Sequence, residues 1–111
     1  MDIDKLTIGK AKQLADTLSG TKQSDVSAWK IGACYLIRTV TMIDTGRLVA
    51  VGEHELVLED AAWIADSGRF SEVLLSYNFS EVEPFPDGQV IIGRGAIIDA
   101  VEIKTLPRQK K

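Results

Sequence analysis

The chain has 111 residues, of which 45% are hydrophobic and 26% are charged. That length predicts a single domain whose core needs no disulfide or metal, and the composition excludes a disordered chain. The net charge of −3, from 13 Lys and Arg against 16 Asp and Glu, argues against a surface that binds long nucleic acid.

The sequence also predicts the compartment. Cys34 is the only cysteine, so no intramolecular disulfide can form, which suits a reducing environment. The first residues lack the pattern of a signal peptide, and no apolar run approaches the roughly 20 residues of a membrane-spanning helix. We therefore expect a cytoplasmic protein with no membrane partner.

Residues 7–18 are predicted to form an N-terminal helix, because Ala11, Leu14, Ala15 and Leu18 recur at the spacing of one apolar stripe. Residues 19–27 are a polar linker that tethers this helix to the main domain, residues 29–103. A stripe this narrow needs a partner, either the chain's own core or a neighbouring subunit. We expect a homo-oligomer, a dimer or larger.

The main domain is β-rich. Stretches dense in β-branched and aromatic residues predict strands at 35–42, 47–51, 55–59, 78–82, 90–92 and 96–103. Turns are expected at 44–46, 52–54 and 83–88, where two prolines should prevent pairing. Residues 61–65 predict a bulged strand, 71–75 a short helical turn, and 104–111 a basic, mobile tail. This order predicts a small antiparallel barrel or rolled sheet with one N-terminal helix.

One motif raises the possibility of catalysis. Residues 42–46 place Asp44, Thr45 and Gly46 after two hydrophobic residues, and 90–93 form a hydrophobic-hydrophobic-Gly segment. Both stretches resemble retroviral-type aspartic proteases, in which a homodimer pairs two carboxylates that share one proton. Arg47 follows the triplet directly, however, and its guanidinium would hold both carboxylates ionised. A β-turn is the favoured interpretation, and we expect no enzyme activity.

Metal and phosphate motifs are weak in this sequence. His54 is the only histidine and lies in a polar, turn-like stretch, so a solvated loop residue is favoured over a metal ligand. Gly93, Arg94 and Gly95 lack the glycine spacing and the lysine of nucleotide-binding loops. The two glycines would still let a ligand approach the backbone around Arg94. We expect no metal and no cofactor.

Arginines within the β domain are candidates for binding an anion. Arg38, Arg47, Arg69 and Arg94 all lie within or beside predicted strands and turns. Arginine presents a planar fork to phosphate and stacks on aromatic rings, and Arg69 directly precedes Phe70, which suits a base and its phosphate. The alternative is that these arginines form ion pairs with acids such as Asp44, Glu59 and Asp66.

The stretch from residue 35 to 63, together with 68–70, 81–85 and 95–100, resembles small phage-associated proteins. The resemblance is greatest to the first described type of Thoeris anti-defence sponge, and it covers most of the chain after residue 34. It implies a non-enzymatic oligomer that sequesters glyco-cyclic ADP-ribose, and in some cases cyclic oligonucleotides, in an infected bacterial host. The residues at comparable places for the ligand are Arg47, Phe70, Asn78 and Arg94.

Two alternatives remain open at this stage. The chain could be a phage virion or assembly protein with no nucleotide ligand, in which the tethered helix serves only for oligomerisation. It could also be the homodimeric aspartic protease that uses Asp44.

Overall fold

The computed structural model describes residues 27–111, so the predicted helix at 7–18 and the linker up to residue 26 lie outside the described residues. The described chain contains six strands, one α-helix and one short 3₁₀ helix: β1 Cys34–Thr39, β2 Ile43–Val51, β3 Glu55–Asp66, α2 Phe70–Ser76, β4 Glu81–Pro84, β5 Gln89–Gly93, η2 Arg94–Ala96 and β6 Ile97–Ile103.

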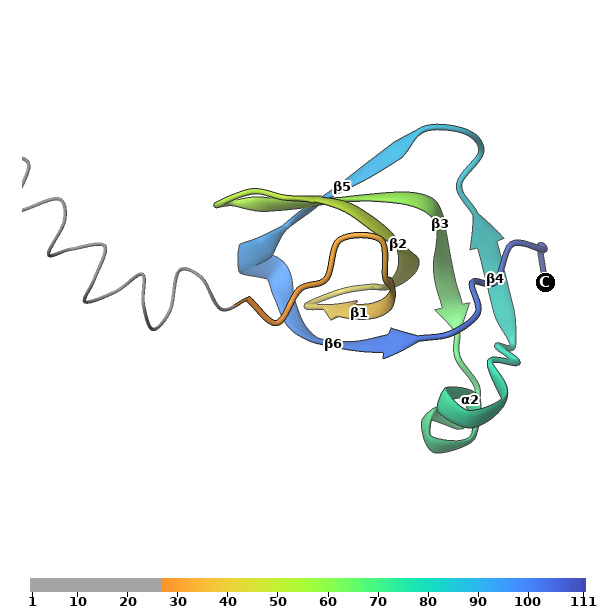
Figure 1. The fold of residues 1–111 in the computed structure, drawn as a ribbon. Coiled ribbons are helices and arrows are strands. Elements are labelled where there is room, and N and C mark those ends of the chain that lie inside the picture. The colour runs from red at the N-terminus through yellow and green to blue at the C-terminus, as the bar shows by residue number, and fades with distance from the viewer. Residues whose placement is uncertain (1–26) are drawn as a thin grey trace, which may run out of the picture.

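All six strands belong to one antiparallel sheet, bent strongly upon itself (Figure 1). The strand order is β4-β3-β2-β1-β6, and β5 pairs with β3. The β-rich prediction is confirmed, whereas closure into a barrel is wrong. The sheet stays open because β4 and β5 both pair with β3, while within residues 27–111 β6 pairs with β1 alone.

The long strand β3 serves two neighbours because it contains a bulge. Its first half, Glu55–Glu59, pairs with β5, and the stretch after the bulge, from Ala62 onward, pairs with β4. Between them the register against β2 shifts, and Asp60 adopts a left-handed conformation with φ of 51°. Aspartate tolerates this conformation better than most residues. The predicted bulged strand is therefore confirmed, and the bulge redirects the sheet.

The expected turn at 44–46 is wrong, because Asp44, Thr45 and Gly46 lie inside β2. The chain reverses earlier, where the amide of Thr39 donates to the carbonyl of Met42 at 2.7 Å. A glycine is needed at Gly46 because an added Cβ would lie 2.9 Å from the Cβ of Leu58. Packing against β3 therefore overrides the local turn preference of this triplet.

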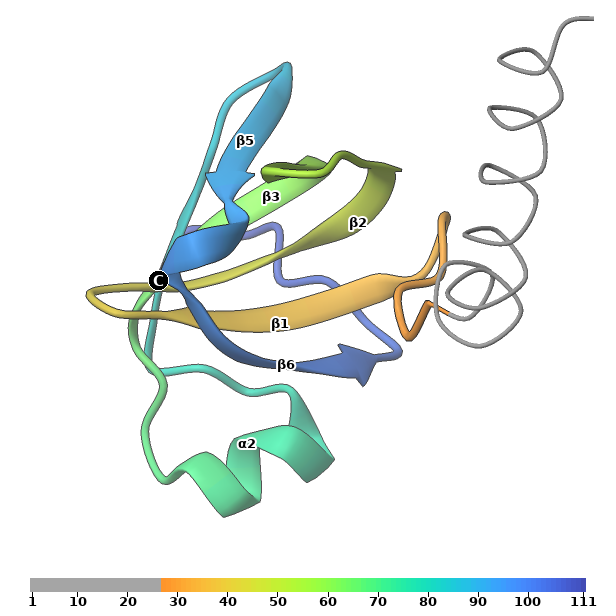
Figure 2. The ribbon, with the colours of Figure 1, turned by 90° about the vertical axis from the view of Figure 1, so that its left-hand side faces the viewer.

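Two apolar clusters form the core, one on each face of the bent sheet. The cluster around Leu48 contains Tyr35, Ile37, Leu48, Leu56, Leu58, Ala61 and Ile92. The cluster around Phe79 contains Leu36, Ala62, Ile64, Val73, Phe79, Val82 and Ile103. Helix α2 packs on the second cluster through Val73 and lies beneath β1 and β6 in Figure 2. Both faces of β1 are therefore buried, which explains its continuous apolar sequence.

The C-terminal tail packs along β4, so the expectation of a mobile tail is wrong. The amide of Val82 donates to the carbonyl of Lys111 at 3.1 Å, and the amide of Lys111 donates back at 2.9 Å. Leu106 packs against the Phe79 cluster. The unpaired turn expected at 83–88 is also wrong at its start, since Pro84 pairs with Ala62 at the end of β4.

Candidate functional site

The structure does not bring the five predicted ligand residues into one cavity. Arg47 lies on β2 and Arg94 begins η2, while Arg69 and Phe70 lie at the start of α2 and Asn78 follows that helix. None of them lines the three cavities described below. Each, however, makes defined contacts, and these contacts separate side chains held for structure from those left available to a ligand.

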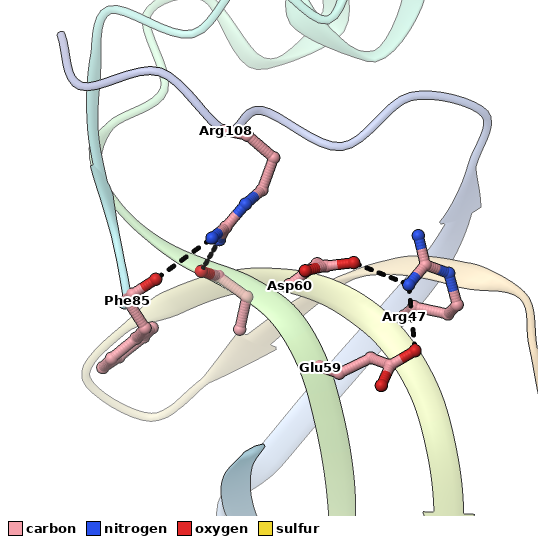
Figure 3. Close-up of polar contacts among 6 residues, drawn as sticks. Arg47, Glu59, Asp60, Phe85 and Arg108 are labelled. Atoms are coloured by element: carbon pink, nitrogen blue, oxygen red, sulfur yellow. Dashed lines mark hydrogen bonds and ion pairs between the residues drawn. The ribbon is translucent and has the colours of Figure 1, made fainter. Parts of the chain in front are cut away.

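Arg47 is held at the bulge of β3 (Figure 3). Its Nη1 donates to Glu59 Oε1 at 3.0 Å and to Asp60 Oδ2 at 2.7 Å. The hydrogen bond to Asp60, followed by that to Glu59, raises the pKa of Arg47. The pairing with acids that the sequence left open is thus present for Glu59. The side chain remains 36% exposed, so it is partly accessible to solvent.

Arg94 is held in a comparable way at the hairpin between β2 and β3. Its Nη1 donates to the carbonyl of Gly52 at 2.7 Å, and its amide donates to the carbonyl of His54 at 2.9 Å. Both contacts use backbone acceptors, so within residues 27–111 no carboxylate pairs with this guanidinium. Arg94 therefore keeps its charge available to an anion.

Phe70 contacts an arginine that the sequence did not assign to it. The guanidinium of Arg38 lies 4.9 Å from the centre of the Phe70 ring. Nε and Nη2 of Arg38 both donate to Asp99, with the Nε–Oδ1 distance at 2.7 Å. This pair raises the pKa of Arg38 and lowers the pKa of Asp99. Arg38 thus occupies one side of the Phe70 ring by a cation–π contact.

Asn78 and Arg69 differ sharply in how firmly they are held. The Asn78 Oδ1 accepts a hydrogen bond from Lys111 Nζ, which also donates to the carbonyl of Phe79 at 2.9 Å. Arg69 is 75% exposed, and its Nε lies 4.0 Å from Glu72. Arg69 is therefore the least restrained of the five residues, because a long exposed ion pair imposes little order.

Arg108 is a residue that sequence reasoning missed, since it lies in the tail expected to be mobile. Its Nη1 donates to the carbonyl of Ala61 and its Nη2 donates to the carbonyl of Phe85 at 3.1 Å. Figure 3 shows Arg108 and Arg47 approaching the same stretch of β3, with Asp60 between them. No sequence pattern reports this convergence, because it depends on the tail folding back across β4.

The way each guanidinium is held distinguishes the arginines. Among the hydrogen bonds of residues 27–111, those from the side chains of Arg47 and Arg94 use Nη1 only. The Nε–Nη2 edge of each guanidinium, which matches two oxygens of a phosphate, takes no part in these hydrogen bonds. Arg38 uses that same edge for Asp99. Arg94 is thus the best suited to bind an anion, Arg47 offers the same edge beside two carboxylates, and Arg38 is structural.

Three of the cavities on the described surface bear on the site. One, of about 420 Å³, lies at the β1–β2 hairpin and is lined by residues 38–43 and 63–65 and by Ile98. A second, about 340 Å³, is lined by Ala28, Trp29, Tyr35 and residues 97–100. The third, about 250 Å³, separates the tail from Tyr77, Phe79 and Val82. The first two share Ile98, so they flank the start of β6.

Asp44 is 7% exposed, and its Oδ1 has no hydrogen-bond partner among residues 27–111. Burial raises the pKa of this carboxyl. Within the same residues no cluster of three His, Cys, Asp or Glu side chains could hold a metal. Nor does that part of the chain contain a helix long and apolar enough to cross a membrane.

Comparisons with known proteins give a likeness of modest extent. No family model matches the chain, and no curated protein matches it. Among solved structures, a heptameric archaeal Sm protein is 20% identical, with a TM-score of 0.49 over 67% of this chain and 90% of that chain.

Proposed function

We propose that the protein binds a cyclic nucleotide signal such as glyco-cyclic ADP-ribose, and possesses no activity that converts it. The observation that supports this most is that Arg47 and Arg94 both donate through Nη1. The Nε–Nη2 edge of each guanidinium, which matches two phosphate oxygens, therefore remains free of those contacts. A fixed orientation lowers the entropy that a side chain loses when it binds. The resemblance to anti-defence sponges supplies the ligand class.

In this proposal, Arg47 and Arg94 contact the diphosphate, Phe70 stacks on a base and Asn78 contacts a sugar or a base edge. Arg69, the exposed neighbour of Phe70, adds positive charge. These residues do not share one of the described cavities, and in this proposal residues from more than one copy of the chain complete the site. The protein is therefore proposed to act as a homo-oligomer in the cytoplasm of an infected bacterium.

Calorimetry with glyco-cyclic ADP-ribose and with cyclic dinucleotides tests the proposal. A hydrogen bond to a charged group contributes about 1.5–3 kcal/mol, so Arg94→Ala should weaken binding roughly tenfold to a hundredfold. Arg47→Lys keeps the charge but removes the fork, and should weaken binding as well. The matched control is Lys104→Ala, which removes one positive charge elsewhere and should leave affinity unchanged.

The proposal also requires that the ligand is chemically unchanged when it dissociates from the protein. Heating the protein and analysing the released small molecule by mass spectrometry should recover the nucleotide that was added. If neither ligand class binds, or if the arginine variants bind like the parent, the proposal is wrong.

A second candidate is an assembly protein without a nucleotide ligand. It is favoured by the large apolar side chains that are exposed around the hairpin cavity, Val40, Met42, Trp63 and Ile98. Apolar side chains gathered in this way mark protein interfaces more often than ligand sites of a highly charged molecule. An oligomer that contains no nucleotide after purification, and binds none, would favour this candidate.

A further inference from the structure

The two edge strands of the sheet, β4 and β6, differ in whether their outer sides are paired. At one end, β4 is covered by the chain's own tail through the reciprocal hydrogen bonds between Val82 and Lys111. At the other end, β6 pairs with β1 on one side, and no described residue pairs with its outer side. Figure 1 shows this strand running along the outside of the sheet. An open edge presents unpaired N–H and C=O groups and is a template for another strand.

The side chains of β6 are exposed along most of its length, from Ile98 to Glu102. Ile98 is 64% exposed and Val101 is 38% exposed. The two acids of the strand have partners within their own chain: Asp99 pairs with Arg38 and Glu102 pairs with Lys30 at 3.4 Å. The edge therefore carries apolar surface and little unneutralised charge, which lowers the electrostatic cost of bringing a second edge beside it.

We propose that β6 pairs antiparallel with β6 of a second copy, about a two-fold axis that passes beside Ala100. A two-fold interface places the residue at the axis opposite itself. An axis at Asp99 or Glu102 would oppose identical acids. Centring on Ala100 pairs all seven residues of Ile97–Ile103 and opposes no like charges.

In this register Ile97 faces Ile103, Ile98 faces Glu102 and Asp99 faces Val101 of the second copy. The pairing satisfies the outward backbone groups of both strands and joins the two sheets into one. It also places a second copy beside Ile98, the residue shared by the cavities of about 420 and 340 Å³. The interface thus covers apolar surface that the described chain leaves open.

A disulfide tests the register in the full-length chain. Cα atoms of directly opposed antiparallel residues lie about 4.5–5.5 Å apart, within the range that a disulfide spans. In a Cys34→Ala background, Ala100→Cys should form a covalent dimer upon mild oxidation. The control is Leu75→Cys in the same background, since Leu75 is 85% exposed on α2. Cross-linking at neither position, or equally at both, overturns the proposal.

A charge swap provides a second test, read by light scattering. Ile98→Glu would oppose Glu102 of the second copy at two symmetric places, and should raise the dimer dissociation constant roughly tenfold. Adding Glu102→Lys should restore the dimer, while Leu75→Glu should leave it unchanged. A parent chain with the mass of one 12.1 kDa subunit, or an Ile98→Glu variant that the second change fails to rescue, overturns the proposal. Neither test involves a nucleotide, so its outcome is separate from that of the proposed function.

Discussion

Gly46 offers a direct test of why the Asp-Thr-Gly triplet forms a strand. An added Cβ would lie 2.9 Å from the Cβ of Leu58, 3.0 Å from its Cδ1 and 3.3 Å from the Cβ of Ala61. Cβ atoms do not approach other carbons this closely, so β2 and β3 must move apart at the bulge. Leu58 and Ala61 are almost completely buried, which leaves little room for that movement.

We expect Gly46→Ala to lower the free energy of unfolding by about 1–3 kcal/mol, the usual cost of one methyl group too many in a packed core. With a urea m-value of about 1–3 kcal/mol/M, the midpoint should fall by roughly 1 M. The m-value itself should not change, because the same surface is buried. Equilibrium urea unfolding followed by tryptophan fluorescence measures both quantities.

Gly93→Ala is the matched control, because Gly93 also lies in a strand and an added Cβ there meets nothing within 4 Å. It should leave stability unchanged or raise it by about 0.4–1 kcal/mol through the unfolded chain. If Gly46→Ala proves as stable as Gly93→Ala, the close approach of β2 and β3 is not the reason for glycine at Gly46.

Three further predictions concern other residues. Burial raises the pKa of Asp44, so the ionised carboxylate destabilises the folded protein above that pKa, and this cost disappears as the pH falls to about 3.9, the unfolded value. Asp44→Asn should therefore stabilise the protein at pH 7 but not near pH 3. An equal effect at both pH values would contradict this reasoning. Purified protein should show no acid-optimum peptide cleavage, and cleavage that Asp44→Asn abolishes would establish the protease alternative. Arg108→Ala should cost about 1–3 kcal/mol in thermal unfolding, whereas Lys110→Ala should cost nothing, and equal stability of the two variants would show that the tail contacts are weak.

Much of the fold was predictable from local patterns. Alternating apolar residues marked the strand at Glu55–Glu59, and β-branched and aromatic residues marked β1 and β6. Gly52 to His54 form the predicted turn, and residues 71–75 fall inside α2. These features depend on residues close in sequence, whose preferences act in the same direction as the final packing.

The pairing of the strands across the bend of the sheet, and the contacts that hold each arginine, were decided by tertiary structure. β3 meets β5 and β4 on either side of its bulge, and no local pattern states which strands will pair across such a bend. Asp44 to Gly46 favour a turn in isolation, but burial against β3 holds them in a strand. Arg38 and Arg47 both lie in strands of the same hairpin. The Nε–Nη2 edge of Arg38 binds Asp99, whereas Arg47 donates through Nη1 and its Nε–Nη2 edge makes no such contact. Such contacts join residues far apart in the chain, so only the folded arrangement determines them.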